Sequence, residues 1–196
     1  MTRKNIFFRV DSSFELGFGH LNRCLIFAEI FKKRKIKVHF ICKNLKGNVT
    51  NEIKSRGYKL HFIKNLKNSV YEDYLNTRKI LERFETKTCY LVIDNYLWDE
   101  KYEQKLRLFV EKIIVIDDLA NRKHDCDLLL DQNYYLEQSR YVNLVQKNTR
   151  QLIGLDYLLL RREFEDARRN LLRKKGAIEK ILVFFGGFDI SNETCK

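Results

Sequence analysis

The residues best suited to chemistry lie near the start of the chain, where a glycine-rich turn runs directly into a histidine. The turn reads Gly17-Phe18-Gly19-His20, and an apolar helical pattern begins immediately after it. Glycines let a ligand approach the backbone closely, and the first N–H groups of a helix point toward an anion. The arrangement therefore predicts a site for an anionic or sugar-diphosphate ligand, with Gly17 and Gly19 in its lining.

His20 is the candidate for acid–base chemistry. The positive end of a helix dipole disfavours the imidazolium form, so a histidine at this position tends to remain neutral. A neutral imidazole can accept a proton from water and so act as a general base. A second interpretation stays open, because a lone G-x-G-H turn is a weak motif. In that interpretation His20 caps the helix or binds a ligand without catalysing.

Short apolar strands alternate with helical patterns along most of the chain. Strands are expected at 6–10, 37–42, 58–63, 89–93, 112–116, 127–130 and 151–154, and helices at 21–31, 49–55, 70–84 and 100–109. Near-continuous apolar strands separated by helices indicate a parallel sheet covered on both faces. With right-handed crossovers, the prediction is an α/β fold with a Rossmann-like, doubly wound parallel sheet.

Polar residues follow four of the expected strands. They are Asp11-Ser12-Ser13, Asp94-Asn95-Tyr96, Asp117-Asp118 and Asp131-Gln132-Asn133. Ligands of such sheets bind beyond the carboxyl ends of the strands, so the repeated placement predicts a binding site at this edge. Each residue also has a structural alternative: Asp94 could cap the following turn, Tyr96 could pack, and Asp117 and Asp118 could fix a loop.

Composition narrows the class of partner. The net charge is +12, but the basic residues are spread along the chain, and the densest patch, 161–175, also carries acidic side chains. Such a patch is typical of a solvated helix face. No zinc-ligand spacing or RNP-type aromatic motif accompanies it, so we expect no nucleic-acid partner. A basic surface would equally attract a sugar nucleotide.

Cysteine usage and hydropathy predict the location. The five cysteines are scattered, with no C-x-x-C spacing, which indicates reduced thiols in a cytoplasmic protein. With 44% hydrophobic residues the chain can form a core. No stretch approaches the roughly 18 apolar residues of a membrane span, and the first residues lack the pattern of a signal peptide. We expect a cytoplasmic protein without a membrane span.

The last stretch predicts the start of a second unit. Residues 180–185 read as a buried strand, and Gly186-Gly187 follows as a phosphate-type loop. The expected organisation is a Rossmann-like domain over 1–158, a linker helix over 159–178, and the first strand and loop of an incomplete C-terminal domain over 179–196. One strand and a loop cannot bury themselves. We therefore expect a separate C-terminal half or a partner chain.

Several motifs, in order along the chain, resemble the UDP-sugar hydrolases of pseudaminic acid biosynthesis. The most specific is the run from Val115 to Asn133. The others are Arg9–Ser13 with His20 and Arg23, Val92–Tyr96, Gly154–Arg161 and Val183–Gly187.

The resemblance implies a fold and a reaction. It implies the N-terminal domain of a GT-B, two-Rossmann-domain architecture, in which water takes the place of a sugar acceptor. Water attacks the anomeric carbon, the bond to UDP breaks and the configuration inverts, with no metal and no cofactor. His20 would be catalytic, and Tyr96 would lie beside the sugar or the water. The implied substrate-binding residues are Asp11, Gly17, Gly19, Arg23, Asp94, Tyr96, Gly186 and Gly187.

Two departures from the family pattern leave alternatives open. Phe188 stands where a serine is expected and Ile190 where a proline is expected, and the UDP-binding domain is nearly absent. The resemblance thus implies a truncated product, half of a split enzyme or a fragment, with little activity of its own. A GT-B glycosyltransferase is the alternative enzyme. The alternative of another class is a non-catalytic subunit that docks a partner.

Overall fold

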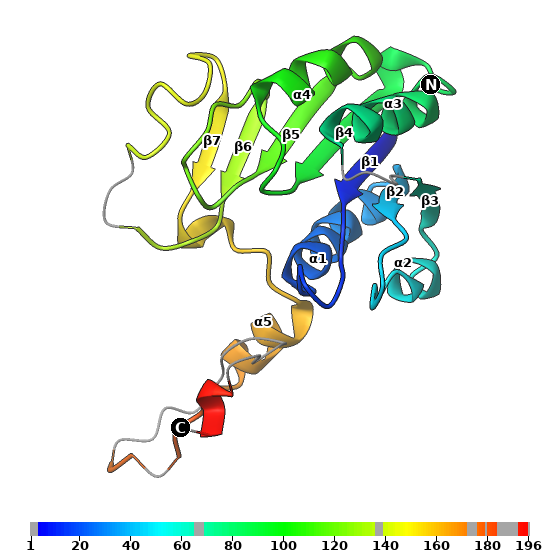
Figure 1. Ribbon diagram of the computed structural model, residues 1–196. Helices are drawn as coiled ribbons and strands as arrows, with labels where there is room; N and C mark the ends of the chain where they lie inside the picture. Colours follow the sequence, from blue (N-terminus) through cyan, green and yellow to red (C-terminus); the bar gives the residue numbers. More distant parts are fainter. Residues whose placement is uncertain are drawn as a thin grey trace.

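Seven strands form one parallel sheet with helices on both sides (Figure 1). The computed structural model describes residues 4–64, 69–135, 139–171, 176–178, 180–183 and 192–195. The strands are β1 (Asn5–Val10), β2 (Lys37–Lys43), β3 (Lys59–Ile63), β4 (Cys89–Asp94), β5 (Lys112–Ile116), β6 (Leu128–Asp131) and β7 (Arg150–Ile153). Each expected strand in this region is confirmed to within one residue at either end.

The helices that connect the strands are also close to those expected. They are α1 (Gly19–Lys33), α2 (Asn51–Ser55), α3 (Val70–Leu81) and α4 (Glu100–Leu106), with short 3-10 helices at Thr86–Thr88 and Arg107–Phe109. After β7 come α5 (Arg162–Arg169) and 3-10 helices at Leu155–Tyr157 and Glu193–Cys195. No helix in the described part of the chain is both long enough and apolar enough to cross a bilayer.

The strand order is β3-β2-β1-β4-β5-β6-β7, so the chain reverses its direction of winding between β1 and β4. This order is that of a Rossmann-like doubly wound sheet, and the predicted fold class is confirmed. In such a sheet the crevice for ligands opens beyond the carboxyl ends of the two strands that flank the reversal. Here those ends are Val10 of β1 and Asp94 of β4, which are paired in register.

Alternate residues of β1 face opposite layers of the core. Ile6 and Phe8 pack in the cluster that contains the buried face of α1, whereas Phe7 lies in the cluster with residues of α3 and α4. Figure 1 shows α3 and α4 on one side of the sheet and α1 on the other. All six residues of β1 are buried. Both faces of the central strand are therefore covered, which leaves its carboxyl end as the place where it can present polar groups.

The turn between β1 and α1 is held by its own backbone. The Gly17 amide donates to the Ser13 carbonyl at 2.9 Å, and the Ser13 hydroxyl accepts from the amides of Glu15 and Leu16. Gly17 has a φ of +72°, which a residue with a Cβ adopts only at a cost. The turn places His20 as the second residue of α1, directly beyond β1.

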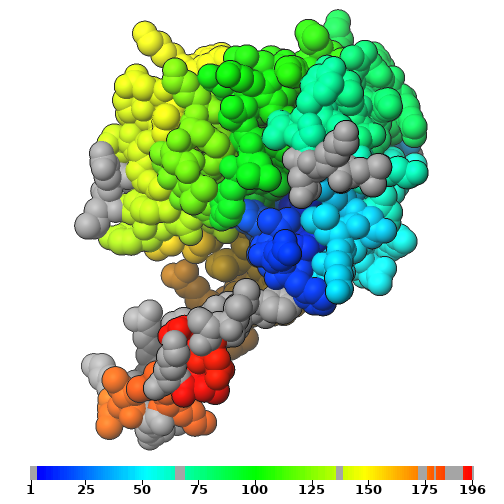
Figure 2. Space-filling view, in the orientation of Figure 1, coloured from blue at the N-terminus to red at the C-terminus, as the bar shows by residue number. Residues whose placement is uncertain are grey.

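The segment beyond β7 is largely exposed. Figures 1 and 2 show α5 projecting away from the sheet, and none of its residues is buried. In the part of the expected strand that the structure describes, residues 180–183, there is no regular structure, and Ile181 and Leu182 are 80% and 91% exposed. Because no described residue pairs with this segment, it lacks the neighbour that a strand requires. The predicted division at 159–178 and 179–196 stays a prediction.

Candidate functional site

The buried carboxylate of Asp94 brings the end of β4 and the start of α1 together. Nδ1 of His20 lies 2.6 Å from Asp94 Oδ1, and Arg23 donates from Nε and Nη2 to the two Asp94 oxygens, each at 2.6 Å. His20 and Arg23 are three residues apart, so they share one face of the helix. The Asp94 side chain is 0% exposed. Two residues of one helix turn are thus fixed by a single acceptor group from the neighbouring strand.

These contacts set the charge of Asp94 and the tautomer of His20. Burial alone would raise the pKa of Asp94, but the hydrogen bonds from Arg23 and His20 outweigh it and hold that pKa below its usual range. An ionised carboxylate can only accept, so the His20 Nδ1–H donates to it, and in the neutral imidazole the lone pair lies on Nε2. Arg23 Nη2 also lies 3.1 Å from Nδ1, because both groups converge on Oδ1.

The second ring nitrogen of His20, Nε2, takes no part in the contact with Asp94. Within the described residues, Nε2 has no hydrogen-bond partner, and the His20 side chain is 14% exposed. The Tyr96 ring meets the imidazole edge-on, with 4.6 Å between ring centroids and 78° between planes. Burial and the Asp118 carboxylate raise the pKa of Tyr96 to about 12. The phenol therefore stays protonated beside a histidine that can accept a proton.

Asp118, which the sequence places among the polar residues that follow the strands, with loop fixing as the alternative, joins this group. Its Oδ2 accepts from Arg23 Nη1 at 2.9 Å and from the Tyr96 hydroxyl at 3.3 Å. Oδ1 of Asp118 is buried and has no hydrogen-bond partner among the residues that the structure describes. The sequence pointed to Asp118 only through its position, two residues after the end of β5. Its pairing with Arg23, 95 residues earlier, cannot be seen in the local sequence pattern.

Asp11, predicted to line the ligand pocket, belongs to a second buried network. Arg9 donates to both oxygens of Asp11, at 2.7 and 3.0 Å, and also to both oxygens of Asp73 in α3. The Lys43 amide donates to Asp11 Oδ1 at 2.7 Å. Asp11 thereby ties the end of β1 to the end of β2. Its predicted contact with substrate stays a prediction.

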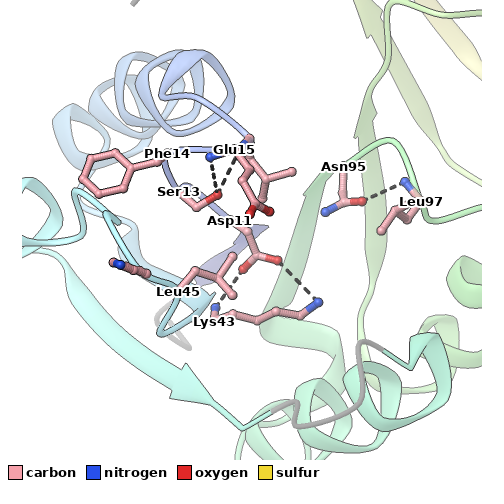
Figure 3. A pocket seen from close by; sticks show the side chains of 10 residues that line it. Asp11, Ser13, Phe14, Glu15, Lys43, Leu45, Asn95 and Leu97 are labelled. Carbon is pink, nitrogen blue, oxygen red and sulfur yellow. Dashed lines mark hydrogen bonds and ion pairs between the residues drawn. The ribbon is translucent and has the colours of Figure 1, made fainter. Parts of the chain in front are cut away.

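A cavity of about 400 Å³ opens beyond the ends of β1, β2 and β4 (Figure 3). Its wall combines side chains from the β1–α1 turn, the residues after β2 and the residues after β4. The lining residues are Asp11, Ser13, Phe14, Glu15, Leu16, Lys43, Leu45, Lys46, Asn95 and Leu97. Asn95 follows Asp94 and precedes Tyr96 in the chain, so the cavity adjoins the His20 group. Gly17 and Gly19 do not line it.

The remaining predicted positions fall into two groups. Both loop glycines, Gly17 and Gly19, have open space where a Cβ would lie. Gly186 and Gly187 lie outside the described residues, as do the departures at Phe188 and Ile190. Within the described part of the chain, no group of three or more His, Cys, Asp or Glu side chains is arranged to hold a metal ion.

Comparison with known proteins gives relatives for nearly the whole chain. No protein-family model matches it. Over 189 residues it is 34% identical to the UDP-2,4-diacetamido-2,4,6-trideoxy-beta-L-altropyranose hydrolase of Campylobacter jejuni, an alignment that covers 95% of this chain. The resemblance expected from the motifs is confirmed. The chain spans 62% of that relative's length.

Two further matches are more distant. An uncharacterized protein of Methanocaldococcus jannaschii is 28% identical over 191 residues, which cover 95% of this chain and 37% of that protein. Among solved structures, MurG of Acinetobacter baumannii matches with a TM-score of 0.49 and 8% identity, over 68% of this chain and 42% of that one.

Proposed function

We propose that this chain carries the sugar-binding and catalytic domain of a hydrolase that releases UDP from UDP-2,4-diacetamido-2,4,6-trideoxy-β-L-altropyranose. The similarity to the Campylobacter jejuni hydrolase supports the substrate. The observation that carries the proposal is the orientation of His20. Its Nδ1 is held by buried Asp94, and its Nε2 is left free at the edge of the sheet where ligands bind.

In the proposed reaction, a water molecule lies between His20 Nε2 and the anomeric carbon. The water oxygen forms a bond to that carbon as its proton passes to Nε2, and the bond between the carbon and the β-phosphate oxygen breaks. UDP leaves with the electron pair of that bond, and the sugar keeps the hydroxyl on the opposite face. General-base assistance of this kind contributes about 10²- to 10⁴-fold in rate.

The groups behind the histidine act through it. Asp94 holds the imidazole in the productive tautomer and stabilises the imidazolium that forms, as the carboxylate does in other carboxylate–histidine pairs. Arg23 keeps Asp94 ionised and ties it to Asp118. We therefore assign Asp94, Arg23 and Asp118 as positioning residues. The Tyr96 ring meets the imidazole edge-on, and its hydroxyl, which donates to Asp118, is proposed to accept a hydrogen bond from the water or from the sugar.

The test is a phosphorus NMR time course with the UDP-sugar and the 196-residue chain. We expect signals of free UDP to grow slowly, because this chain spans 62% of the length of the related hydrolase, and His20→Gln to slow them further, by at least about 100-fold. His61→Gln is the matched control, because it makes the same change in β3, where the histidine contacts His39 rather than the His20 group. It should leave the rate unchanged. Absence of UDP from the unaltered chain, or equal rates for His20→Gln and the unaltered chain, would overturn the proposal.

A further inference from the structure

The cavity beside His20 matches the chemistry of one particular substituent. We propose that it binds an acetamido group of the sugar and so selects N-acetylated substrates. This inference rests on the proposed function, because an acetamido group is what distinguishes the sugar of the related hydrolase from an ordinary pyranose. An acetamido group carries one carbonyl acceptor, one N–H donor and one methyl group. The cavity offers a counterpart to each.

Asn95 supplies the donor for the carbonyl oxygen. Its Oδ1 accepts from the Leu97 amide at 2.7 Å, which fixes the orientation of the side-chain amide and leaves its NH₂ group on the other side. Figure 3 shows that nitrogen turned toward the cavity, opposite Asp11. The Asx-type turn thus fixes the orientation of the Asn95 NH₂ group as a hydrogen-bond donor. The ammonium group of Lys43 lies in the same lining and is a second donor.

The charges of the lining favour a neutral group over a phosphate. The lining holds two carboxylates, Asp11 and Glu15, and two ammonium groups, Lys43 and Lys46. Lys43 is paired with Asp11 Oδ2 at 3.9 Å and with Asp73 Oδ2 at 3.4 Å. The lining therefore offers a diphosphate no net positive charge, whereas an amide needs only hydrogen bonds. The Glu15 carboxylate is the acceptor proposed for the amide N–H, because both Asp11 oxygens already accept from Arg9.

The apolar part of the lining suits a methyl group. Phe14, Leu16 and Leu97 are 49%, 46% and 67% exposed, although each is a large hydrophobic side chain. Covering such surface is favourable by about 25 cal/mol per Å². A Cβ at Gly47 would lie 2.3 Å from the Phe14 ring, so the glycine leaves room for the ring in its present position. With a larger residue at position 47, the ring would have to shift.

The decisive probe is the free sugar, 2,4-diacetamido-2,4,6-trideoxy-altropyranose, compared with the same sugar carrying hydroxyls in place of the acetamido groups. Both are titrated into the ¹⁵N-labelled chain, and amide signals are followed by NMR. We expect the diacetamido sugar to shift the signals of Leu16, Asn95 and Leu97, and to bind at least about tenfold more tightly. Equal affinities, or shifts that avoid these residues, would overturn the inference.

A matched pair of glycine variants tests the cavity wall. Gly47 and Gly57 have φ values of +72° and +76°, so an alanine is similarly strained at both. At Gly57 the nearest atom to a new Cβ is Lys32 Nζ, at 4.0 Å, whereas at Gly47 it is the Phe14 ring. Gly47→Ala is expected to weaken binding of the diacetamido sugar about tenfold, and Gly57→Ala to leave it unchanged. Equal effects of the two would count against the inference.

Asn95→Asp isolates the hydrogen bond. It keeps the acceptor for the Leu97 amide but replaces the NH₂ donor with a carboxylate, so binding of the diacetamido sugar should fall more than about tenfold. The free sugars contain no UDP, which separates this inference from the proposed function. Cavity binding without UDP release would refute the hydrolase alone. UDP release without a preference for the diacetamido sugar would refute the cavity alone.

Discussion

Two buried arginine–carboxylate networks lie at the carboxyl ends of adjacent strands, and they differ in what they leave open. The Arg9 side chain of β1 is 0% exposed and binds both Asp11 and Asp73. Its Cζ lies 4.4 Å from the centroid of the Trp98 ring. Arg23 of α1 binds Asp94 and Asp118 and is 10% exposed. The first network is closed by protein except where Asp11 and Lys43 line the cavity. The second ends in His20, whose Nε2 has no hydrogen-bond partner among the described residues.

The Arg9 network stabilises the fold, whereas the Arg23 network also orients a side chain that can react. In the Arg9 network each guanidinium nitrogen donates to a carboxylate, and the Asp73 carboxylate also accepts from the Tyr102 hydroxyl at 2.8 Å. Burial would raise the pKa of Asp73, but Arg9 overcomes this and lowers it. Nothing in the network remains to act on a ligand except the edge that Asp11 and Lys43 present to the cavity. The Arg23 network instead uses its buried carboxylate to orient a group that does remain available.

The largest effect, a loss in the free energy of unfolding, is expected from removing the guanidinium group of the Arg9 network. Arg9→Met would leave Asp11 and Asp73 with Lys43 as their only cationic neighbour in the described part of the chain. Breaking a buried ion pair in this way costs about 3–5 kcal/mol. Urea denaturation followed by circular dichroism should show that loss in the free energy of unfolding. As a control, Arg78→Met breaks an exposed pair with Glu82 and should cost little. Equal losses would contradict the distinction.

Next in size is the loss of orientation in the open network. Asp94→Asn keeps the shape of the side chain but no longer accepts the His20 Nδ1–H as an anion, which favours the wrong tautomer. We expect UDP release to fall about 100- to 1000-fold in kcat with a small change in KM. Asp73→Asn is the matched control in the closed network, where stability should fall but kcat of the folded protein should not. An equal fall of kcat in both variants would contradict the assignment of different roles to the two networks.

A smaller effect is expected from loss of the Tyr96 hydroxyl. Tyr96→Phe keeps the edge-on ring contact with His20 but removes the hydroxyl that donates to Asp118. We expect UDP release to slow about tenfold, the typical worth of one hydrogen bond made in the transition state. Tyr135→Phe removes another hydroxyl that bonds near Asp118, at its backbone oxygen, and should leave the rate unchanged. Equal rates for Tyr96→Phe and the unaltered chain would remove Tyr96 from the reaction.

The strands and the position of His20 could be read from the sequence because they depend on local pattern. Apolar runs such as 89–93 and 112–116 are nearly the strands themselves. The helix start after Gly17 follows equally from a short stretch of chain. His20 was singled out for the same reason, since its neighbours in the sequence are also its neighbours in the turn.

The partners of these residues could not be read, because they depend on tertiary packing. Arg9 meets Asp73 across 64 residues, and His20 meets Asp94 across 74. Neither pairing changes the local pattern. Asp94 was expected to contact substrate or cap a turn. The structure shows that it accepts from His20, and its contact with substrate stays a prediction. Residues 180–183 show the converse, since this apolar run has no neighbouring strand among the described residues and no regular structure.

The smallest predicted effect is a pH dependence of the free energy of unfolding that arises at His39, outside both networks. Burial, and then His61, lower the pKa of His39 to about 4 from 6.5. Between these values the unfolded chain binds more protons than the folded one, so stability rises with pH. The stability that neutral, buried His39 contributes is fully present above about pH 6.5 and is lost as pH falls toward 4. After allowance for solvent screening, we expect the free energy of unfolding to fall by about 1 kcal/mol over this range.

His39→Phe should flatten this slope, because a phenyl ring can stack on Phe7, which His39 now contacts at 4.5 Å between ring centroids. The loss of stability below about pH 4 should persist in that variant, because Asp73 and Asp94 have lowered pKa values and contribute stability that disappears only as they are protonated. Denaturation curves between pH 3 and 7 measure both regions at once. If His39→Phe also removed the acid limb, the two carboxylate networks would not be the acid-sensitive part of the fold.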